Sequence, residues 1–396
     1  MLYKLAQVTK TIFYAVKKDD MMFTLLKSLE CYCPQYSGKN DILLACGKIH
    51  KIQSKSTWEH AALIDQTIDC DGLIAFPGLI DQHVHIIGGG GEQGFSSRVG
   101  EINIHEILKA GVTTLVGLLG TDACTRSMES LFAKAKSLEF QGITTYIYSG
   151  SYSIPIVTFT ESIVKDLVLI DKVIGTGEVA ISDHRSSHAD SIMLLKLASD
   201  THVGGLLGGK AGVVHLHVGD GKAGLNPLLR IVEDSDLPIE EFVPTHVNRN
   251  PSLFKQAIKY CKDGGNIDLT AGETNGIPVP DAVSKLVDSG YDLSRVTISS
   301  DANGSIPGGG SGKIQCLYDD IQNCILKENL EPEIVFRLVT ENVAKILKLY
   351  PQKGTLQEGS DADILITDKN YNIRKLFCMG RLILDDGCVM ENGTKA

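Results

Sequence analysis

The sequence predicts an α/β fold: a (β/α)8 TIM-like barrel with a small β-sandwich domain built from both chain ends. Eight short apolar segments alternate with helical patterns between residues 74 and 301. Short β-like segments separated by turn residues occur on both sides of that region. The 396 residues also exceed the usual size of one domain, so a large domain with a small companion is expected.

The two ends of the chain share the same β-like pattern. Near the start the segments are 23–26, 41–46 and 48–52, and near the end they are 361–366, 373–377 and 380–384. We therefore expect residues 22–74 and 350–396 to form the small β domain. Residues 1–21 contain four lysines around a short apolar stretch without a clear cleavage site, and we interpret them as an N-terminal extension.

The region between the ends, residues 75–349, is expected to form the barrel. Its predicted strands are 74–85, 113–120, 143–150, 173–182, 212–219, 241–246, 266–271 and 295–301. The predicted helices between them include 125–138, 190–198 and 281–289. Eight strand–helix repeats fit a closed barrel better than an open doubly wound sheet, and in such barrels the chemistry lies at the C-terminal strand ends.

Composition excludes several classes of partner. The formal net charge of −10 argues against nucleic acid and against an anionic membrane surface. No apolar run reaches the roughly 18–20 residues that span a bilayer. The ten cysteines are scattered without a Cys-x-x-Cys pair, which is typical of reduced, mostly buried thiols. We expect a cytoplasmic protein with no nucleic acid or membrane partner.

Ionisable side chains gather at the predicted strand ends. His83 and His85 share one face of the first strand, because side chains alternate with period two. A His-x-His pair alone is a weak indication, since a lone histidine is more often a core residue. That explanation would have to hold at five strand ends together, because later strands carry Glu178, His217, His246 and Asp301. His215 lies one step deeper than His217 and is expected to be a core or supporting residue.

Four imidazoles and two carboxylates at one rim suit a divalent metal. Nitrogen and oxygen ligands of this kind favour Zn²⁺, with Mn²⁺, Co²⁺ or Fe²⁺ as alternatives. Six ligands are too many for one catalytic zinc, which keeps an open position. Two metals that share a bridging carboxylate use them better, and two-metal sites suit hydrolysis. The sequence therefore predicts a hydrolase with two divalent metal ions, zinc being the expected one.

Several motifs carry a family resemblance. The stretch 77–85 and the later histidines resemble the amidohydrolase superfamily. The stretches 88–92, 119–122, 180–185, 244–250 and 300–305 are similar to those of its isoaspartyl dipeptidases. The resemblance covers roughly residues 22 to 390. It implies that a metal-bridging hydroxide hydrolyses the amide bond of β-aspartyl dipeptides such as β-Asp-Leu. It also implies a homo-oligomer, with an octamer as one form.

The same resemblance implies roles for single residues. His83 and His85 hold one metal with Asp301, while His217 and His246 hold the other. Asp301 is the proton acceptor and donor, and Tyr152 donates to the developing oxyanion. The substrate carries two carboxylates and one ammonium group. The residues expected to contact it are Tyr152, Arg185, Arg249, Ser305, Glu92, Gly90 and Thr121.

One position departs from the family pattern. The family commonly has a lysine there, carboxylated by CO₂, which bridges the two metals. This chain has Glu178, with one extra residue in the turn. Our hypothesis is that the extra residue shifts the backbone so that Glu178 bridges the metals directly. The alternative is that Glu178 does not reach and one metal binds weakly.

Two other functions remain open at this point. One is another amidohydrolase reaction, by a cyclic amide hydrolase or an N-acyl amino acid deacylase. The other is a catalytically silent relative that serves in assembly. Such relatives usually lose ligands, whereas this chain keeps four histidines and Asp301.

Overall fold

The computed structural model describes residues 22–54, 61–306, 310–391 and 394–395. The chain divides into two compact units. One ends at Gly78 and resumes at Thr355, and the other is Leu79–Gly354. The predicted N-terminal extension, residues 1–21, lies outside the described residues.

The first unit contains one mixed sheet to which both ends of the chain contribute. Its order is β18-β17-β16-β15-β14-β5-β1-β2-β3, with β4 beside β1. Antiparallel pairing of β14 with β5 joins the two chain ends. The buried core includes Leu26, Ile42 and Phe377. The mixed sheet agrees with a small β domain, and its description as a sandwich stays a prediction. The strands are β1 (Thr24–Tyr32), β2 (Tyr36–Ala45), β3 (Lys48–Gln53), β4 (Gln66–Asp69), β5 (Ile74–Pro77), β14 (Ile364–Thr367), β15 (Ile373–Cys378), β16 (Arg381–Asp385), β17 (Cys388–Glu391) and β18 (Thr394–Lys395).

The second unit contains parallel strands in chain order. Six of them form one sheet, in the order β11-β10-β9-β8-β7-β6, and β12 and β13 form a parallel pair. This arrangement resembles a barrel, although the count of eight strands in one closed barrel stays a prediction. The strands are β6 (Leu79–Val84), β7 (Val112–Gly117), β8 (Thr144–Ser149), β9 (Val173–Ile181), β10 (Val213–Val218), β11 (Phe242–Thr245), β12 (Ile267–Thr270) and β13 (Val296–Ser299).

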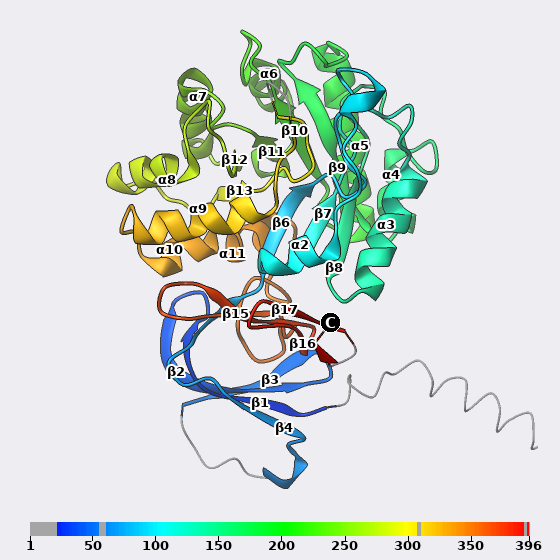
Figure 1. The fold of residues 1–396 in the computed structure, drawn as a ribbon. Coiled ribbons are helices and arrows are strands. Elements are labelled where there is room, and N and C mark those ends of the chain that lie inside the picture. The colour runs from blue at the N-terminus through cyan, green and yellow to red at the C-terminus, as the bar shows by residue number, and fades with distance from the viewer. Residues whose placement is uncertain (1–21, 55–60, 307–309, 392–393, 396) are drawn as a thin grey trace, which may run out of the picture. The chain divides into compact units, whose positions relative to one another are not determined.

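Helices lie on the outside of these strands (Figure 1). The side chains of Ser127, Asp190 and Asn250 accept hydrogen bonds from amides in the first turns of α3, α5 and α7, which sets where these helices begin. No helix within the described ranges is long and apolar enough to cross a membrane. The helices are α2 (Ile104–Lys109), α3 (Met128–Phe140), α4 (Ile163–Leu169), α5 (Ser191–Gly208), α6 (Asn226–Asp234), α7 (Pro251–Lys262), α8 (Val279–Asp288), α9 (Gln315–Leu326), α10 (Pro332–Arg337) and α11 (Glu341–Ile346).

The strands of the parallel sheet are buried almost throughout, because helices cover them outside and side chains fill the inside. Ile80, Val116 and Val243 belong to one apolar cluster of this unit. Some polar side chains of these strands are paired, as Gln82 is, which donates to Asp268 over 2.8 Å. Others are not: Thr114 Oγ1 is buried and has no hydrogen-bond partner among the described residues.

The predicted first strand, 74–85, is in fact two strands in two sheets. Ile74–Pro77 is β5 of the mixed sheet, and Leu79–Val84 is β6 of the parallel sheet. The chain passes from one unit to the other at Gly78. Both strands are buried, so the apolar run continues across the break and hides it.

Candidate metal centre

The parallel strands bring the predicted metal ligands together. His83 and His217 lie within β6 and β10, while His85 and His246 directly follow β6 and β11. Asp301 lies two residues beyond β13. His246 and Asp301 have positive φ angles, 62° and 49°, which are uncommon for residues with a side chain and are often found at functional sites. The centre is therefore built at the carboxyl ends of the strands, as the sequence predicted.

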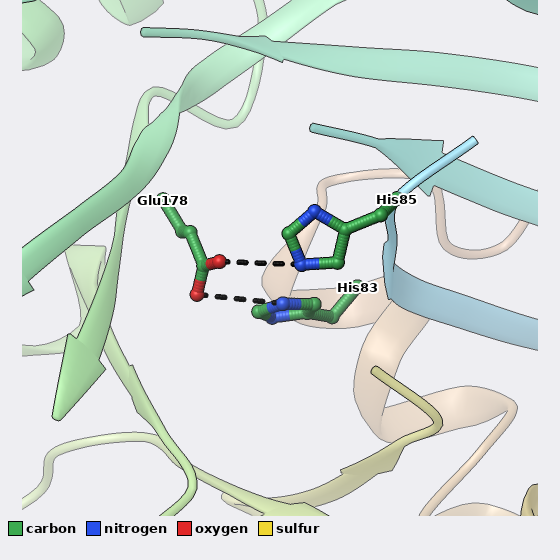
Figure 2. A group of neighbouring side chains, drawn as sticks. All are labelled: His83, His85 and Glu178. Atoms are coloured by element: carbon green, nitrogen blue, oxygen red, sulfur yellow. Dashed lines mark ion pairs between the residues drawn. The ribbon is translucent and has the colours of Figure 1, made fainter. Parts of the chain in front are cut away.

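Glu178 lies between the two pairs of histidines. Figure 2 shows its carboxylate facing His83 and His85, with Oε2 and Oε1 each 3.4 Å from the Nε2 of the corresponding ring. On the other side, Oε2 is 3.2 Å from His217 Nδ1 and 3.6 Å from His246 Nε2. Four imidazoles thus converge on one carboxylate.

A bulge in β9 aims Glu178 into this centre. Thr176 and Val179 pair with Val214 and Leu216 of β10, so β9 has one residue more than its neighbour over this interval. The position of Gly177 leaves no room for a side chain, because a Cβ there would lie 2.8 Å from the carbonyl oxygen of His215. The bulge therefore sets the course of the backbone at Glu178.

Asp301 completes the centre on the side of β6. Its Oδ1 lies 3.3 Å from His83 Nε2 and 3.2 Å from His85 Nε2. Ligand atoms lie within 4.8 Å of one another in three overlapping groups: His83, His85 and Glu178; His83, His246 and Asp301; and Glu178, His217 and His246. The predicted ligands therefore form one contiguous cluster.

The electrostatics of the cluster suit a cation. Burial raises the pKa of Glu178, but His83 and His217 outweigh burial and hold the pKa well below its usual value. Burial also raises the pKa of Asp301, but hydrogen bonds with His83 and His85 outweigh burial and hold this pKa well below the usual range. Burial lowers the pKa of His246 to about 3, so this ring is neutral and can offer a lone pair. Ionised carboxylates and a neutral His246 can donate to a divalent metal, whereas Glu178 and Asp301 outweigh burial and raise the pKa of His83 and His85, so these two rings would bind a metal on losing a proton.

Unpaired buried atoms point to the same conclusion. His83 Nε2, Glu178 Oε1 and Asp301 Oδ1 are buried and have no hydrogen-bond partner among the described residues. Buried polar atoms without partners are costly, and a bound ion removes that cost. The residues present therefore fit a metal.

Neighbouring groups orient the rings. His83 Nδ1 lies 2.8 Å from His215 Nε2, and His246 Nδ1 lies 2.7 Å from Thr270 Oγ1. Such contacts set which ring nitrogen faces a metal. The interpretation of His215 as a supporting residue agrees with this contact. Thr270 has no role in the sequence analysis, because nothing in its local pattern sets it apart.

Asp183 is a second residue that the sequence analysis missed. Its Oδ2 lies 2.9 Å from His217 Nε2, and its two oxygens accept from Arg185 Nε and Nη2 over 2.9 and 2.8 Å. Burial raises the pKa of Asp183, but Arg185 and His217 outweigh it and hold the pKa far below the usual value. The sequence did offer one indication of this role, because Asp183 stands two residues before Arg185, which was predicted to contact the substrate.

The predicted substrate residues form a polar wall beside the metal centre. Glu92 Oε1 accepts from Thr121 over 3.1 Å and from Ser305 over 3.0 Å, and Arg185 Nη1 lies 3.4 Å away. Arg249 Nη1 lies 3.5 Å from His217 Nε2. Gly90 lines the same 330 Å³ cavity as Glu92 and Thr121.

Tyr152 lies between this wall and the metal centre. Its hydroxyl is 2.8 Å from His217 Nδ1, and the Arg185 guanidinium lies 5.2 Å from its ring centre. Burial raises the pKa of Tyr152 well above the usual value, so the hydroxyl keeps its proton at neutral pH. The structure thus brings together the residues that the motifs singled out.

Known proteins resemble this chain over most of its length. A model of the amidohydrolase family matches residues 74–383. The crystal structure of β-aspartyl dipeptidase from Fervidobacterium islandicum AW-1 in complex with β-Asp-Leu is 42% identical, with a TM-score of 0.88, and the match covers 94% of this chain and 99% of that one.

More distant relatives share the fold. The L-hydantoinase of Paenarthrobacter aurescens is 24% identical over 390 residues, which cover 84% of this chain and 83% of the relative. The structure of dihydropyrimidinase from Brevibacillus agri NCHU1002 is 14% identical, with a TM-score of 0.65, and the match covers 94% and 96% of the two chains. The family match confirms the resemblance on which the sequence analysis relied: this chain belongs to the amidohydrolase family.

Proposed function

We propose that the protein hydrolyses the amide bond of β-aspartyl dipeptides such as β-Asp-Leu, with two divalent cations, zinc being the expected metal. The observation that carries this proposal is the convergence of four imidazoles on the Glu178 carboxylate, at distances of 3.2–3.6 Å. The 42% identical β-aspartyl dipeptidase bound to β-Asp-Leu supports the choice of substrate.

The ligands divide into two sets around Glu178. His83, His85 and Asp301 would hold one ion, and His217 and His246 the other, with Glu178 between them. Two cations bound there would supply the nucleophile, because they lower the pKa of a shared water towards neutrality and hold it as hydroxide.

Two residues carry the proton transfer and the oxyanion contact. The side chain of Asp301 is 19% exposed whereas that of Glu178 is fully buried, so Asp301 is the carboxylate that substrate can reach. Asp301 accepts the proton released on attack and returns it to the leaving amine. The Tyr152 hydroxyl, which keeps its proton, donates to the oxygen on which negative charge develops.

The polar wall matches the charges of the substrate. Arg185 and Arg249 present guanidinium groups to the two carboxylates of a β-aspartyl dipeptide. Glu92, held by Thr121 and Ser305, pairs with the ammonium group. Gly90, which lines the cavity beside Glu92, has no room for a side chain, because a Cβ there would lie 2.5 Å from the carbonyl oxygen of Ser97.

We also infer that the eight parallel strands close into one (β/α)8 barrel, and that the two predicted domains, 22–74 with 350–396 and 75–349, correspond to the two compact units, with the boundaries moved to Gly78 and Thr355 because β5 belongs to the mixed sheet. The amide of Val247, after β11, donates to Asp268 of β12 over 3.4 Å. A parallel bridge joins Val84 of β6 to Ala302, just beyond β13. Both contacts support closure. The active form is proposed to be a homo-oligomer.

A turnover assay tests the function. Metal-free and zinc-loaded protein would be offered β-Asp-Leu, α-Asp-Leu and hydantoin, with amine release or ring opening as the readout. We expect zinc-dependent hydrolysis of β-Asp-Leu and at least a hundredfold preference over α-Asp-Leu. Hydrolysis of hydantoin without β-Asp-Leu turnover would instead favour a cyclic amide hydrolase.

Metal analysis tests the role of Glu178 separately. Two equivalents of zinc per chain are expected for the wild type, and fewer for Glu178→Gln, which keeps the shape but loses the charge. Glu106→Gln, an exposed change on α2, is the matched control and should bind as the wild type does. Fewer than two equivalents in the wild type after zinc loading would exclude the bridge.

A further inference from the structure

Arg126 is a buried arginine that the proposed chemistry does not use. Its side chain is 5% exposed, and it directly precedes Ser127, the residue that caps α3. Its Nε donates one hydrogen bond, and Nη1 and Nη2 donate two each, which is the full capacity of a guanidinium. A buried charge is costly unless its donors are satisfied, so the five acceptors show what this residue holds in place.

Four of the five acceptors are backbone carbonyl oxygens of one segment, residues 87–100, which we call the glycine loop. Nη2 donates to Gly89 over 2.7 Å and to Val99 over 3.1 Å. Nε donates to Ile87 over 3.3 Å, and Nη1 donates to Gly90 over 3.4 Å. Three of these carbonyls belong to the outgoing arm of the loop and the one at Val99 to the returning arm. The guanidinium therefore ties the two arms together.

The glycine loop depends on contacts from outside for its shape. A Cβ at Gly88 would lie 2.1 Å from the carbonyl oxygen of Val99, and φ at Gly88 is 79°, so the two arms approach too closely for any other residue there. Glycine has more backbone freedom to lose on folding than any other residue, and positions 88–91 are all glycine. The sequence of the loop thus permits its conformation without enforcing it, and Arg126 supplies four hydrogen bonds that do.

The fifth acceptor connects Arg126 to the segment that supports Glu92. Nη1 donates to Asp122 Oδ2 over 3.1 Å, and Arg98 of the glycine loop donates to the same oxygen over 2.6 Å. Asp122 directly follows Thr121, whose hydroxyl donates to Glu92 Oε1 over 3.1 Å. Glu92 itself stands in the glycine loop. One guanidinium thus holds both the loop that carries Glu92 and the segment that carries its hydrogen-bond donor.

We propose that Arg126 is a positioning residue for substrate selection: by bracing the glycine loop and Asp122, it holds Glu92 where the α-ammonium group of the substrate binds. This inference rests on the proposed function for the identity of the substrate. The hydrogen bonds of Arg126 within the described ranges go to the glycine loop and to Asp122, so its effect on the substrate passes through Glu92.

A pair of compounds that differ only in the ammonium group tests the proposal. N-succinyl-leucine is β-Asp-Leu with hydrogen in place of that group, and it can be measured as a competitive inhibitor. In Arg126→Met we expect the KM for β-Asp-Leu to rise roughly 10–100-fold, which is what a hydrogen bond to a charged group contributes. The kcat should change less than about threefold, because a binding contact is lost, and the inhibition constant of N-succinyl-leucine less than about twofold. Arg126→Lys should behave like Arg126→Met, since three donors on one nitrogen cannot replace the planar fork.

Lys172→Met is the matched control, because it also removes a buried cation from the same unit. The side chain of Lys172 is 10% exposed, pairs with Glu139 and donates to the carbonyl of Thr145 over 2.8 Å. This variant should lose thermal stability without changing the ratio of the KM for β-Asp-Leu to the inhibition constant of N-succinyl-leucine. If both constants rose equally in Arg126→Met, or if the control changed their ratio as much, general destabilisation would explain the effect and the proposal would be overturned.

Amide hydrogen exchange tests the brace without any substrate. In the zinc-loaded protein, exchange of the glycine loop should be faster in Arg126→Met than in the wild type and unchanged in Lys172→Met. Unchanged exchange in Arg126→Met would refute the brace even if β-Asp-Leu is the substrate, and loss of zinc would trace the effect to the metal centre instead of Glu92. A wild type that hydrolyses no β-aspartyl dipeptide would refute the proposed function and the ammonium contact with it, and faster exchange would then establish the brace alone.

Discussion

Replacing Gly177 by alanine should disrupt the metal centre although Gly177 is no ligand. The bulge of β9 places this residue against β10, with φ at 156°. A Cβ would lie 2.8 Å from the carbonyl oxygen of His215 and 2.9 Å from its Cβ. Both distances are well inside ordinary van der Waals contact, so the backbone of β9 must move, and Glu178 moves with it.

The cost has two parts. Overpacking a well-packed interior destabilises by about 1–3 kcal/mol. A side chain at a φ that favours glycine adds about 1–3 kcal/mol of strain. We therefore expect the free energy of unfolding of the metal-free protein to fall by about 2–6 kcal/mol. A displaced Glu178 should weaken zinc binding by at least the roughly 10–100-fold that loss of a supporting contact costs.

Urea unfolding of the metal-free protein measures the stability, and competition with a chromophoric chelator measures zinc affinity. Gly209→Ala is the control, because Gly209 also has a positive φ, 62°, but no atom of the described residues lies within 4 Å of the place its Cβ would take. The control bears a positive-φ strain without a close contact, so a greater loss in Gly177→Ala reports the approach of β10 together with the larger φ of Gly177. If Gly177→Ala lost no more stability than Gly209→Ala and kept wild-type zinc affinity, the bulge would not position Glu178.

Three other changes follow from the structure. His215→Phe should weaken zinc binding about 10–100-fold because His83 loses the partner of its Nδ1, and unchanged affinity in a calorimetric titration would contradict this. Asp183→Asn should raise the KM for β-Asp-Leu more than it lowers kcat, because Arg185 loses its charged partner; an equal fall in both kcat and kcat/KM would argue against a binding role. For Asp122, burial raises the pKa, but the hydrogen bonds donated to its carboxylate outweigh burial and hold the pKa at about 2. This value is below that of the unfolded chain, about 3.9, so the stabilisation is present above pH 4 and is lost as pH falls towards 2. Urea unfolding should show a smaller deficit for Asp122→Asn at pH 3 than at pH 6, and a deficit independent of pH would refute the assignment.

The sequence by itself determined the features that follow from local patterns. Alternation along a strand placed His83 and His85 on one face, and the apolar segments predicted parallel strands whose polar ends meet. The predicted helix 190–198 starts at Asp190, the residue that caps α5, although the helix continues to Gly208. The family could be recognised from the same motifs, since each motif is a short contiguous stretch.

Only the tertiary structure decided what depends on distant segments. The apolar run 74–85 belongs to two sheets, and nothing in a buried run shows where the partner strand changes. Glu178 reaches the histidines because β9 has one residue more than β10, a register that exists only once both strands pair. The contact of Asp183 with His217 likewise joins distant parts of the chain, the segment after β9 and strand β10. Periodicity reports which way a side chain faces, whereas pairing between distant strands decides what it meets.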